Sequence, residues 1–239
     1  MIVGYFFIGI VSLLAAYVLF LWICSLLVNP NQEYEQNSCF YRFLLNSATG
    51  IGLKALHIRV HVCGMEKVPV GVKLVFVGNH RSNFDPIITW YVFQKWQIAF
   101  ISKAENFEIP IFGRLIRKCC FMVIDRENPR NALTTVNKAA KLLEKQEVSI
   151  GVYPEGTRSK TGELLPFHNG VFKIAKKAAM PIVVLSVIGT EQIHRNTPFH
   201  KSDVYLDVVD VLPAAEVKQM KTAEIGDRVR KALASTNKR

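Results

Sequence analysis

The amino-terminal segment limits the possible folds more than any other feature. Residues 1–28 contain no Asp, Glu, Lys or Arg, and the first charged residue is Glu33. A helix needs about 20 apolar residues to cross the hydrocarbon core of a bilayer. A cleaved signal peptide would show a basic start, a shorter apolar run and a small-residue cleavage site, which this segment lacks. A helix that is apolar on every side cannot be fully buried against a small domain, so we expect residues 1–28 to remain in a membrane.

The rest of the chain is basic, with a formal net charge of +11 for the whole sequence. Such an excess favours an anionic partner, either nucleic acid or the anionic surface of a membrane. The apolar segment favours the membrane, and there is no zinc-finger spacing, basic-region heptad or aromatic RNA-binding motif. We therefore expect membrane lipids as partners and no nucleic acid.

The five cysteines do not form a recognisable pattern. They fit neither a C-x-x-C pair nor a zinc ligand set. Free cysteine usually behaves as a small buried hydrophobic residue. We expect this of all of them and predict no metal site: Cys24, Cys39, Cys63, Cys119 and Cys120.

Hydrophobic periodicity predicts alternating strands and helices. Within residues 33–55, Phe40, Phe43, Leu44 and Ile51 predict an amphipathic helix at the membrane interface. Strands are predicted at residues 56–62, 72–78, 97–102, 119–124, 148–153, 181–188 and 203–211. Helices are predicted at residues 86–95, 107–118, 128–145, 167–179 and 214–234.

This alternation predicts an α/β fold. We expect a mixed, largely parallel sheet of about seven strands covered by helices, preceded by an amino-terminal membrane-associated helical segment. The corresponding domain division places a membrane anchor at residues 1–55 and the globular domain at residues 56–239.

The stretch "LVFVGNHRSNFDP", residues 74–86, joins an apolar strand to a helix. Functional groups of such folds gather on loops beyond the carboxyl ends of strands. Asp85 suits a helix N-cap and Pro86 suits the first helical turn, but neither role explains His80. The spacing allows the Asp85 carboxylate to accept a hydrogen bond from one ring nitrogen of His80. A neutral imidazole held in this way is a competent general base.

Two further segments contribute polar groups. Lys103 ends one apolar strand and Arg126 follows another, so both cations are candidates for the rim that carries His80, although each alone is typical of a solvated surface. After the strand at 148–153 the chain reads Glu155-Gly156-Thr157-Arg158. A glycine permits close backbone approach and a guanidinium suits phosphate oxygens, while the same glycine also suits an ordinary turn.

Together these segments resemble the membrane glycerolipid acyltransferases, and most closely the 1-acyl-glycerol-3-phosphate acyltransferases. The resemblance covers about residues 55–190. Two departures are His168, where a lysine is common, and Leu185, near which a second proline is usual. The matching residues are Asn79-His80 and Asp85-Pro86; Lys103, Glu105, Pro110, Gly113 and Arg126; Pro154 to Arg158 with Phe167 and Gly170; and, more loosely, Pro181.

The resemblance implies transfer of a fatty acyl group from acyl-CoA or acyl carrier protein to 1-acyl-sn-glycerol-3-phosphate, giving phosphatidic acid for phospholipid biosynthesis. The acyl thioester is then a co-substrate, and no cofactor is expected. The enzyme would be membrane-associated, with its active site on the cytoplasmic face. Alternatives are an acyltransferase for another lysolipid or for glycerol-3-phosphate, and a non-catalytic lipid-binding membrane protein.

The resemblance also assigns roles to residues. His80 would act as general base with Asp85 fixing its tautomer, and backbone amides near Gly156 would receive the developing oxyanion. The acceptor phosphate would be held by three cations, and Glu155, Gly156 and Thr157 would form the adjoining turn: Lys103, Arg126 and Arg158. Because the sequence has no G-x-S-x-G motif and no cysteine beside a motif histidine, no acyl-enzyme is expected.

Overall fold

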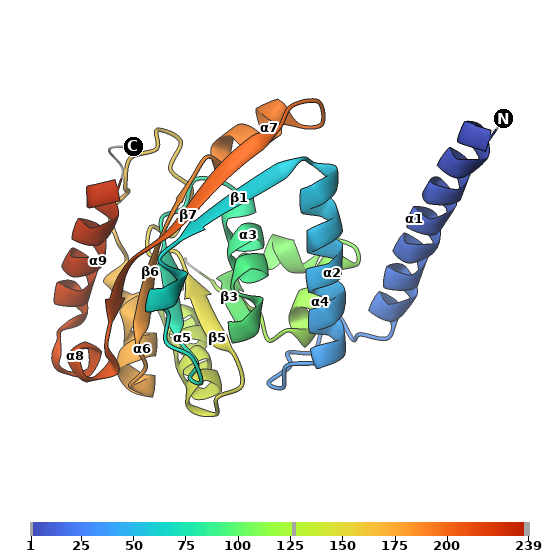
Figure 1. Cartoon of the computed structure of the whole chain (residues 1–239). Helices are drawn as coiled ribbons and strands as arrows, with labels where there is room; N and C mark the ends of the chain where they lie inside the picture. The colour runs from blue at the N-terminus through green and yellow to red at the C-terminus, as the bar shows by residue number, and fades with distance from the viewer. Residues whose placement is uncertain (1, 126–127, 237–239) are drawn as a thin grey trace.

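The computed structural model describes residues 2–125 and 128–236, which form a twisted sheet between helical layers with one long helix projecting from it (Figure 1). All of the predicted strands are present, within a few residues of their predicted bounds. The strands are β1 (Ile58–Cys63), β2 (Val75–Gly78), β3 (Ile98–Ser102), β4 (Met122–Val123), β5 (Ser149–Val152), β6 (Ile182–Ile188) and β7 (Ser202–Leu212). The α-helices are α1 (Ile2–Leu26), α2 (Cys39–Ala55), α3 (Phe84–Val92), α4 (Phe112–Lys118), α5 (Pro129–Glu144), α6 (Lys173–Ala178), α7 (Ile193–Asn196), α8 (Ala214–Gln219) and α9 (Thr222–Thr236). Short 3-10 helices are η1 (Met65–Lys67), η2 (Gln94–Trp96), η3 (Ala104–Phe107), η4 (Asn169–Phe172) and η5 (Thr190–Gln192).

The sheet has seven strands in the order β1-β7-β6-β2-β5-β3-β4. Every pairing is parallel except that between β6 and β7, which is antiparallel. The predicted mixed, largely parallel sheet is confirmed. Because β2, β3, β4, β5 and β6 run in the same direction, the loops that follow them meet at one edge of the sheet.

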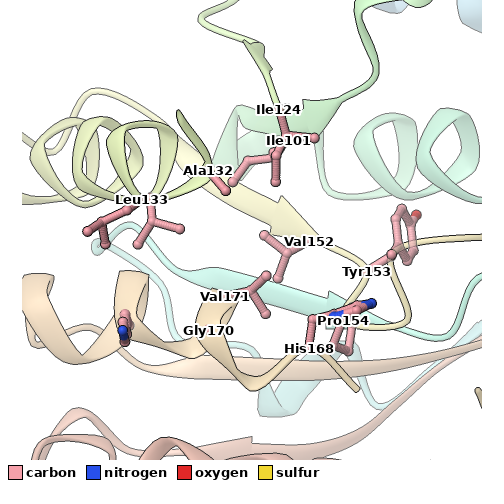
Figure 2. A pocket seen from close by; sticks show the side chains of 13 residues that line it. Ile101, Ile124, Ala132, Leu133, Val152, Tyr153, Pro154, His168, Gly170 and Val171 are labelled. Carbon is pink, nitrogen blue, oxygen red and sulfur yellow. The ribbon is translucent and has the colours of Figure 1, made fainter. Parts of the chain in front are cut away.

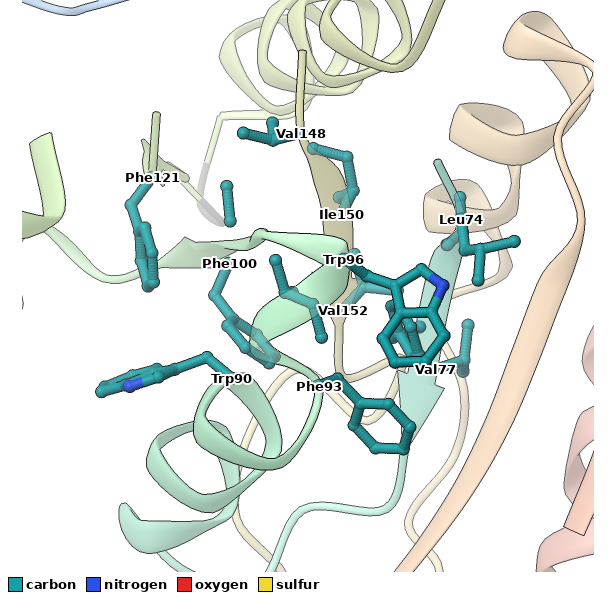
Figure 3. Close-up of a cluster of buried hydrophobic side chains, with 14 of the residues drawn as sticks. Leu74, Val77, Trp90, Phe93, Trp96, Phe100, Phe121, Val148, Ile150 and Val152 are labelled. Carbon is teal, nitrogen blue, oxygen red and sulfur yellow. The ribbon is translucent and has the colours of Figure 1, made fainter. Parts of the chain in front are cut away.

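An aromatic cluster fills the space between the sheet and α3 (Figure 3). Phe76 of β2 and Phe93 lie with ring centroids 4.9 Å apart, and Trp90 meets Phe100 and Phe121 at 6.4 and 5.8 Å. All four residues of β2 are buried, because a central parallel strand is covered on both faces. Each buried aromatic side chain contributes about 1.5–3 kcal/mol of hydrophobic stabilisation. This cluster fixes the strand ends that carry the polar loops.

The helix predicted at residues 107–118 is wrong in its first part. The chain forms η3, turns at Pro110 and Ile111, and begins α4 only at Phe112. Proline disfavours helical backbone in the residue before it, and Ile111 has a φ of +63°. Gly113 is required in this turn, since a Cβ there would lie 2.2 Å from the carbonyl oxygen of Phe107.

Two other predicted helices are divided. Residues 167–179 contain η4 and the short helix α6, and residues 214–234 contain α8 and α9, separated at Met220. The helices α2, α3 and α4 cover one face of the sheet, and α5, α6, α8 and α9 cover the other (Figure 1).

The helix predicted within residues 33–55 is present as α2. Leu44 is buried against the body of the protein, whereas Phe40, Phe43 and Ile51 are exposed. The buried Arg42 of α2 donates hydrogen bonds to the carbonyl oxygens of Ile98 (2.6 Å) and Cys119 (2.8 Å), which attach α2 to the body of the protein. The role of residues 1–55 as a membrane anchor stays a prediction.

Helix α1 is long and apolar enough to cross a membrane by length and composition. Its 25 residues extend about 38 Å at 1.5 Å per residue. Its carboxyl-terminal part contacts the rest of the chain, where Leu21 and Cys24 are buried and the Tyr17 hydroxyl lies 2.7 Å from that of Ser47. The exposed face of α1 is covered with large apolar side chains.

Candidate active site

His80 and Asp85 form a direct pair in the loop after β2. The His80 Nδ1 atom lies 2.9 Å from Oδ2 of Asp85, and Asp85 is fully buried. Asn79 fixes the start of the loop, because its side chain donates to the carbonyl of Val187 and accepts from the Val187 N–H, both at 2.8 Å. The predicted contact between the imidazole and the carboxylate is present.

The Asp85 carboxylate is held at both oxygens. Oδ2 also accepts from the backbone N–H groups of Arg81 (2.6 Å) and Ser82 (2.7 Å), and Oδ1 accepts from the Thr190 hydroxyl. Helix α3 begins at Phe84, so Asp85 lies within the first turn and is not the N-cap that the sequence suggested. A buried carboxylate requires such partners, and together they orient the oxygen that faces His80.

Glu155 supports the same loop from the end of β5. Its Oε1 accepts from the backbone N–H of His80 (2.8 Å), and its Oε2 accepts from that of Leu165 (2.9 Å). Burial raises the pKa of Glu155, and the two backbone donors act in the opposite direction. Glu155 therefore positions the backbone of His80 and does not line the cavity described below.

Tyr153 lies flat against the His80 ring. The two ring centroids are 4.3 Å apart with an interplanar angle of 12°, and Phe100 stacks on the other side of Tyr153 at 5.6 Å. Burial raises the pKa of Tyr153 well above its ordinary value, and the Asp85 carboxylate adds to this shift. The phenol is consequently neutral at physiological pH.

Sequence analysis missed both Thr190 and Tyr153. Thr190 follows the carboxyl end of β6, so a polar residue at that sheet edge was the available signal. Tyr153 directly precedes the Pro154-Glu155 pair, and an aromatic residue at the end of a central strand beside a histidine loop was the signal there.

The turn after β5 places Gly156 beside the site. Its φ of +69° is left-handed, and a Cβ there would lie 3.0 Å from the ring of His168. The Gly156 N–H donates to the Tyr153 carbonyl at 3.0 Å, so this amide is not available for the oxyanion that the sequence placed near it. The Ser159 N–H donates to the His80 carbonyl at 2.8 Å and ties this turn to the histidine loop.

A cavity of about 410 Å³ opens beside His80 and is called here the catalytic cavity. Its polar lining includes the exposed side chains of Lys103 and Arg158, together with Thr157 and the Glu105 carboxylate. Arg126 lies outside the described residues. Much of the remaining lining is apolar: Ile87, Trp90, Phe100, Ile109, Phe112, Ile116 and Phe121. The catalytic cavity thus presents cationic groups and an extended apolar surface beside His80.

The cysteines are free, as predicted. Cys24, Cys119 and Cys120 are buried as expected, whereas Cys39 and Cys63 are exposed, contrary to expectation. Burial raises the pKa of Cys119 to about 11, which disfavours a thiolate nucleophile. Within residues 2–125 and 128–236 no group of three or more His, Cys, Asp and Glu side chains is placed to hold a metal ion.

A family model described as Acyltransferase matches residues 59–188. The chain belongs to this acyltransferase family. The matched segment runs from β1 to the end of β6 and includes the His80–Asp85 pair, Lys103 and the Glu155 turn. The family assignment therefore rests on the same part of the acyltransferase chain that forms the catalytic cavity.

Curated proteins with similar sequences are named 1-acyl-sn-glycerol-3-phosphate acyltransferase. A 1-acyl-sn-glycerol-3-phosphate acyltransferase of Cocos nucifera is 36% identical over 49% of this chain and 38% of its own length. One of Escherichia coli (strain K12) is 31% identical over 61% of this chain and 58% of its own length. The chain thus spans between 38% and 58% of the length of these curated relatives.

The crystal structure of the 1-acyl-sn-glycerophosphate (LPA) acyltransferase PlsC from Thermotoga maritima has the same fold. It matches with a TM-score of 0.67 and 22% sequence identity, and the match covers 93% of this chain and 89% of that one. Because the match covers 93% of this chain, it includes most of the amino-terminal helical region.

Proposed function

We propose that this acyltransferase moves a fatty acyl group from a thioester to the free hydroxyl of 1-acyl-sn-glycerol-3-phosphate, giving phosphatidic acid. The observation that carries the proposal is the His80–Asp85 pair beside a cavity whose lining contains both Lys103 and Arg158 and an extended apolar surface. A lysophosphatidate has an anionic head, a hydroxyl and one hydrocarbon chain in that order. The names of the curated relatives support the same substrate.

The proposed mechanism is direct transfer with general-base assistance. The ring nitrogen of His80 that does not face Asp85 removes the hydroxyl proton as the oxygen attacks the thioester carbonyl carbon. Asp85 holds the tautomer and stabilises the imidazolium. The carbon–sulfur bond then breaks, and the imidazolium returns the proton to the departing thiolate. No acyl-enzyme is formed, and the only co-substrate is the acyl thioester, either acyl-CoA or acyl carrier protein.

Lys103 and Arg158 are proposed to bind the acceptor phosphate, with Arg126 as a third candidate. Charge-assisted contacts from a guanidinium are well suited to phosphate oxygens. Holding the phosphate fixes the position of the hydroxyl relative to His80, and such orientation lowers a barrier by several kcal/mol. Thr157, which also lines the cavity, adds a hydroxyl donor.

We also propose that residues 1–55 anchor the protein and that residues 56–239 carry out the transfer. Support comes from the apolar surface of α1 and from the exposed Phe40, Phe43 and Ile51 of α2. A membrane-associated site on the cytoplasmic face would receive a lipid acceptor without extracting it fully into water.

The experiment is a transfer assay with radiolabelled acyl-CoA and a panel of acceptors: lysophosphatidate, other lysophospholipids, lysocardiolipin and glycerol-3-phosphate. We expect the highest kcat/KM with lysophosphatidate. A higher kcat/KM with another acceptor would make that acceptor the preferred substrate and leave the acyl-transfer reaction as proposed. Lipid binding without transfer to any acceptor would contradict the enzymatic proposal and favour a lipid-binding protein.

A further inference from the structure

A second cavity, of about 290 Å³, lies on the opposite face of the sheet from the catalytic cavity. It is enclosed by α5, β5 and the segment around η4, and Figure 2 shows Tyr153, Pro154 and His168 at one end and Leu133 toward the other. Most of its wall is aliphatic: Ile101, Ile124, Ala132, Leu133, Val136, Val152 and Val171.

The two cavities are adjacent and share part of their walls. Ile101, Tyr153 and Gly156 line both of them, and Tyr153 is the residue stacked on the His80 ring. A molecule that occupies the second cavity therefore has one end within reach of the reacting centre. The mechanism proposed above leaves this second cavity without a function.

The other end of the second cavity reaches Lys173 at the start of α6. Lys173 also lines a surface hollow, which we call the lysine groove: Lys173, Lys176, Lys177, Lys221, Thr222 and Ala223. No acidic side chain lines this groove. Among the described residues, none of its four lysines forms a salt bridge with a carboxylate.

The lysines of the groove differ in whether they also form hydrogen bonds that stabilise the fold. Lys176 Nζ donates to the carbonyl oxygens of Lys218 and Met220, and Lys177 Nζ donates to Asn137, so both also stabilise the fold. Lys173 and Lys221 are exposed, and the nearby Glu224 carboxylate accepts the backbone N–H of Lys221 at 2.7 Å. Lys173 and Lys221 are therefore the cations to alter in a test.

We propose that the second cavity and the lysine groove bind the CoA portion of the acyl donor. The pantetheine arm lies in the second cavity, its sulfur end is next to His80, and the nucleotide phosphates contact the lysine groove. This inference rests on the proposed acyl transfer and adds the donor site to it. An aliphatic cavity that has the residue stacked on His80 in its wall, and that shares Lys173 with a cluster of cations, matches a thioester carried on an arm with phosphates at its far end.

The position of the lysine groove favours a soluble acyl donor, and not an anionic membrane surface, as its ligand. Figure 1 shows α6, α8 and the beginning of α9 at the side of the sheet away from α1. A membrane that receives the apolar surface of α1 would thus lie on the opposite side. The catalytic cavity, lined by α3 and α4, is left for the acceptor and the hydrocarbon chain.

The test compares the K173Q/K221Q variant of the full chain with a matched K141Q/K201Q control. Lys141 and Lys201 are exposed and line none of these cavities, so both variants lose the same charge. Each protein is assayed with acyl-CoA and with the N-acetylcysteamine thioester of the same fatty acid, which lacks the phosphates. We expect kcat/KM for acyl-CoA to fall about tenfold in K173Q/K221Q, mainly through KM, because charge-assisted contacts are lost.

The N-acetylcysteamine thioester should react within about twofold of wild type in every protein, because it has no phosphate to contact the groove. An unchanged KM for acyl-CoA, or equal losses with both donors, would overturn the assignment. The same variants are also assayed with acyl carrier protein as the donor and for binding to anionic vesicles, and a loss confined to either of these would overturn the assignment as well. Failure of the proposed function itself is distinguishable, because wild type would then transfer from neither thioester.

Discussion

At the scale of single residues, the His80 ring is fixed on one side by Asp85 and on one face by Tyr153. The stack restricts the ring to one orientation, and an aromatic face also favours a neighbouring imidazolium. We expect Tyr153→Phe to keep most of the transfer activity, because the stack remains. Tyr153→Leu should lower kcat about tenfold or more, with little change in KM for either substrate.

Steady-state kinetics of the two Tyr153 variants measure the effect of the ring stack on kcat. Circular dichroism checks that both variants are folded. Similar loss in both variants would show that the hydroxyl matters more than the stack. A normal kcat in Tyr153→Leu would remove Tyr153 from the positioning of His80.

Arg158 is expected to act on the acceptor. Arg158→Ala should raise KM for lysophosphatidate much more than KM for acyl-CoA, since a lost charge-assisted hydrogen bond costs about 1.5–3 kcal/mol. Arg158→Lys keeps the charge but not the planar fork, and should lie between wild type and Arg158→Ala. Equal effects on both KM values would argue that Arg158 provides only a general positive potential.

The site contact that was predicted from the sequence and the one that was not differ in how far apart their two residues lie along the chain. His80 and Asp85 are five positions apart, so a single turn brings them together and the sequence predicts the contact. Thr190 and Asp85 are separated by 105 positions, and their hydrogen bond depends on the adjacency of β6 and β2. Periodicity carries no information about such adjacency.

At the scale of elements, α1 divides into an exposed part and a part that packs on the protein. Described residues 4–16 are exposed, whereas Leu21 and Cys24 are buried, and the Tyr41 hydroxyl donates to the Cys24 carbonyl at 3.0 Å. Deleting residues 2–16 should therefore leave the fold intact and remove the long apolar surface. The remaining helix would be too short to cross a bilayer, which requires about 20 apolar residues.

This truncation should retain transfer to a water-soluble, short-chain lysophosphatidate within about threefold, because the contacts around His80 are unchanged. Transfer to a long-chain acceptor in vesicles should fall more than about tenfold, since basic surface supplies only about 1 kcal/mol per cation near a membrane. The ratio of the two activities on one protein controls for partial misfolding. Equal loss of both would place α1 within the architecture of the active site, and no loss of either would remove its proposed role in membrane binding.

Strands were easier to predict than helices for a physical reason. The apolar runs of β2 and β5 are buried throughout and that of β6 is buried up to its last residue, so hydrophobicity alone marks them. The helix predicted at residues 107–118 failed because a single proline outweighed its apolar pattern. The hydrogen bonds from Arg42 of α2 to the carbonyls of Ile98 and Cys119 could not be predicted, because these residues lie 56 and 77 positions away along the chain.

At the scale of the whole molecule, the function depends on one edge of the sheet. The loops after β2, β3, β5 and β6 bring His80, Lys103, Glu155 and Thr190 to that edge. The α/β class followed from alternation of elements, but the strand order β1-β7-β6-β2-β5-β3-β4 and the reversed direction of β1 and β7 did not. Strand order depends on packing between distant segments, which a single sequence does not encode in its local pattern.

The most direct test of the central claim is acyl transfer by His80→Ala, with Asp85→Asn as its companion. The proposed account predicts a loss of about 10² to 10⁴ in kcat for His80→Ala, the scale of a positioned general base. Binding of lysophosphatidate should be largely retained, because Lys103 and Arg158 are unaltered. Folded His80→Ala protein that kept more than about a tenth of wild-type activity would contradict the assignment of His80 as the general base.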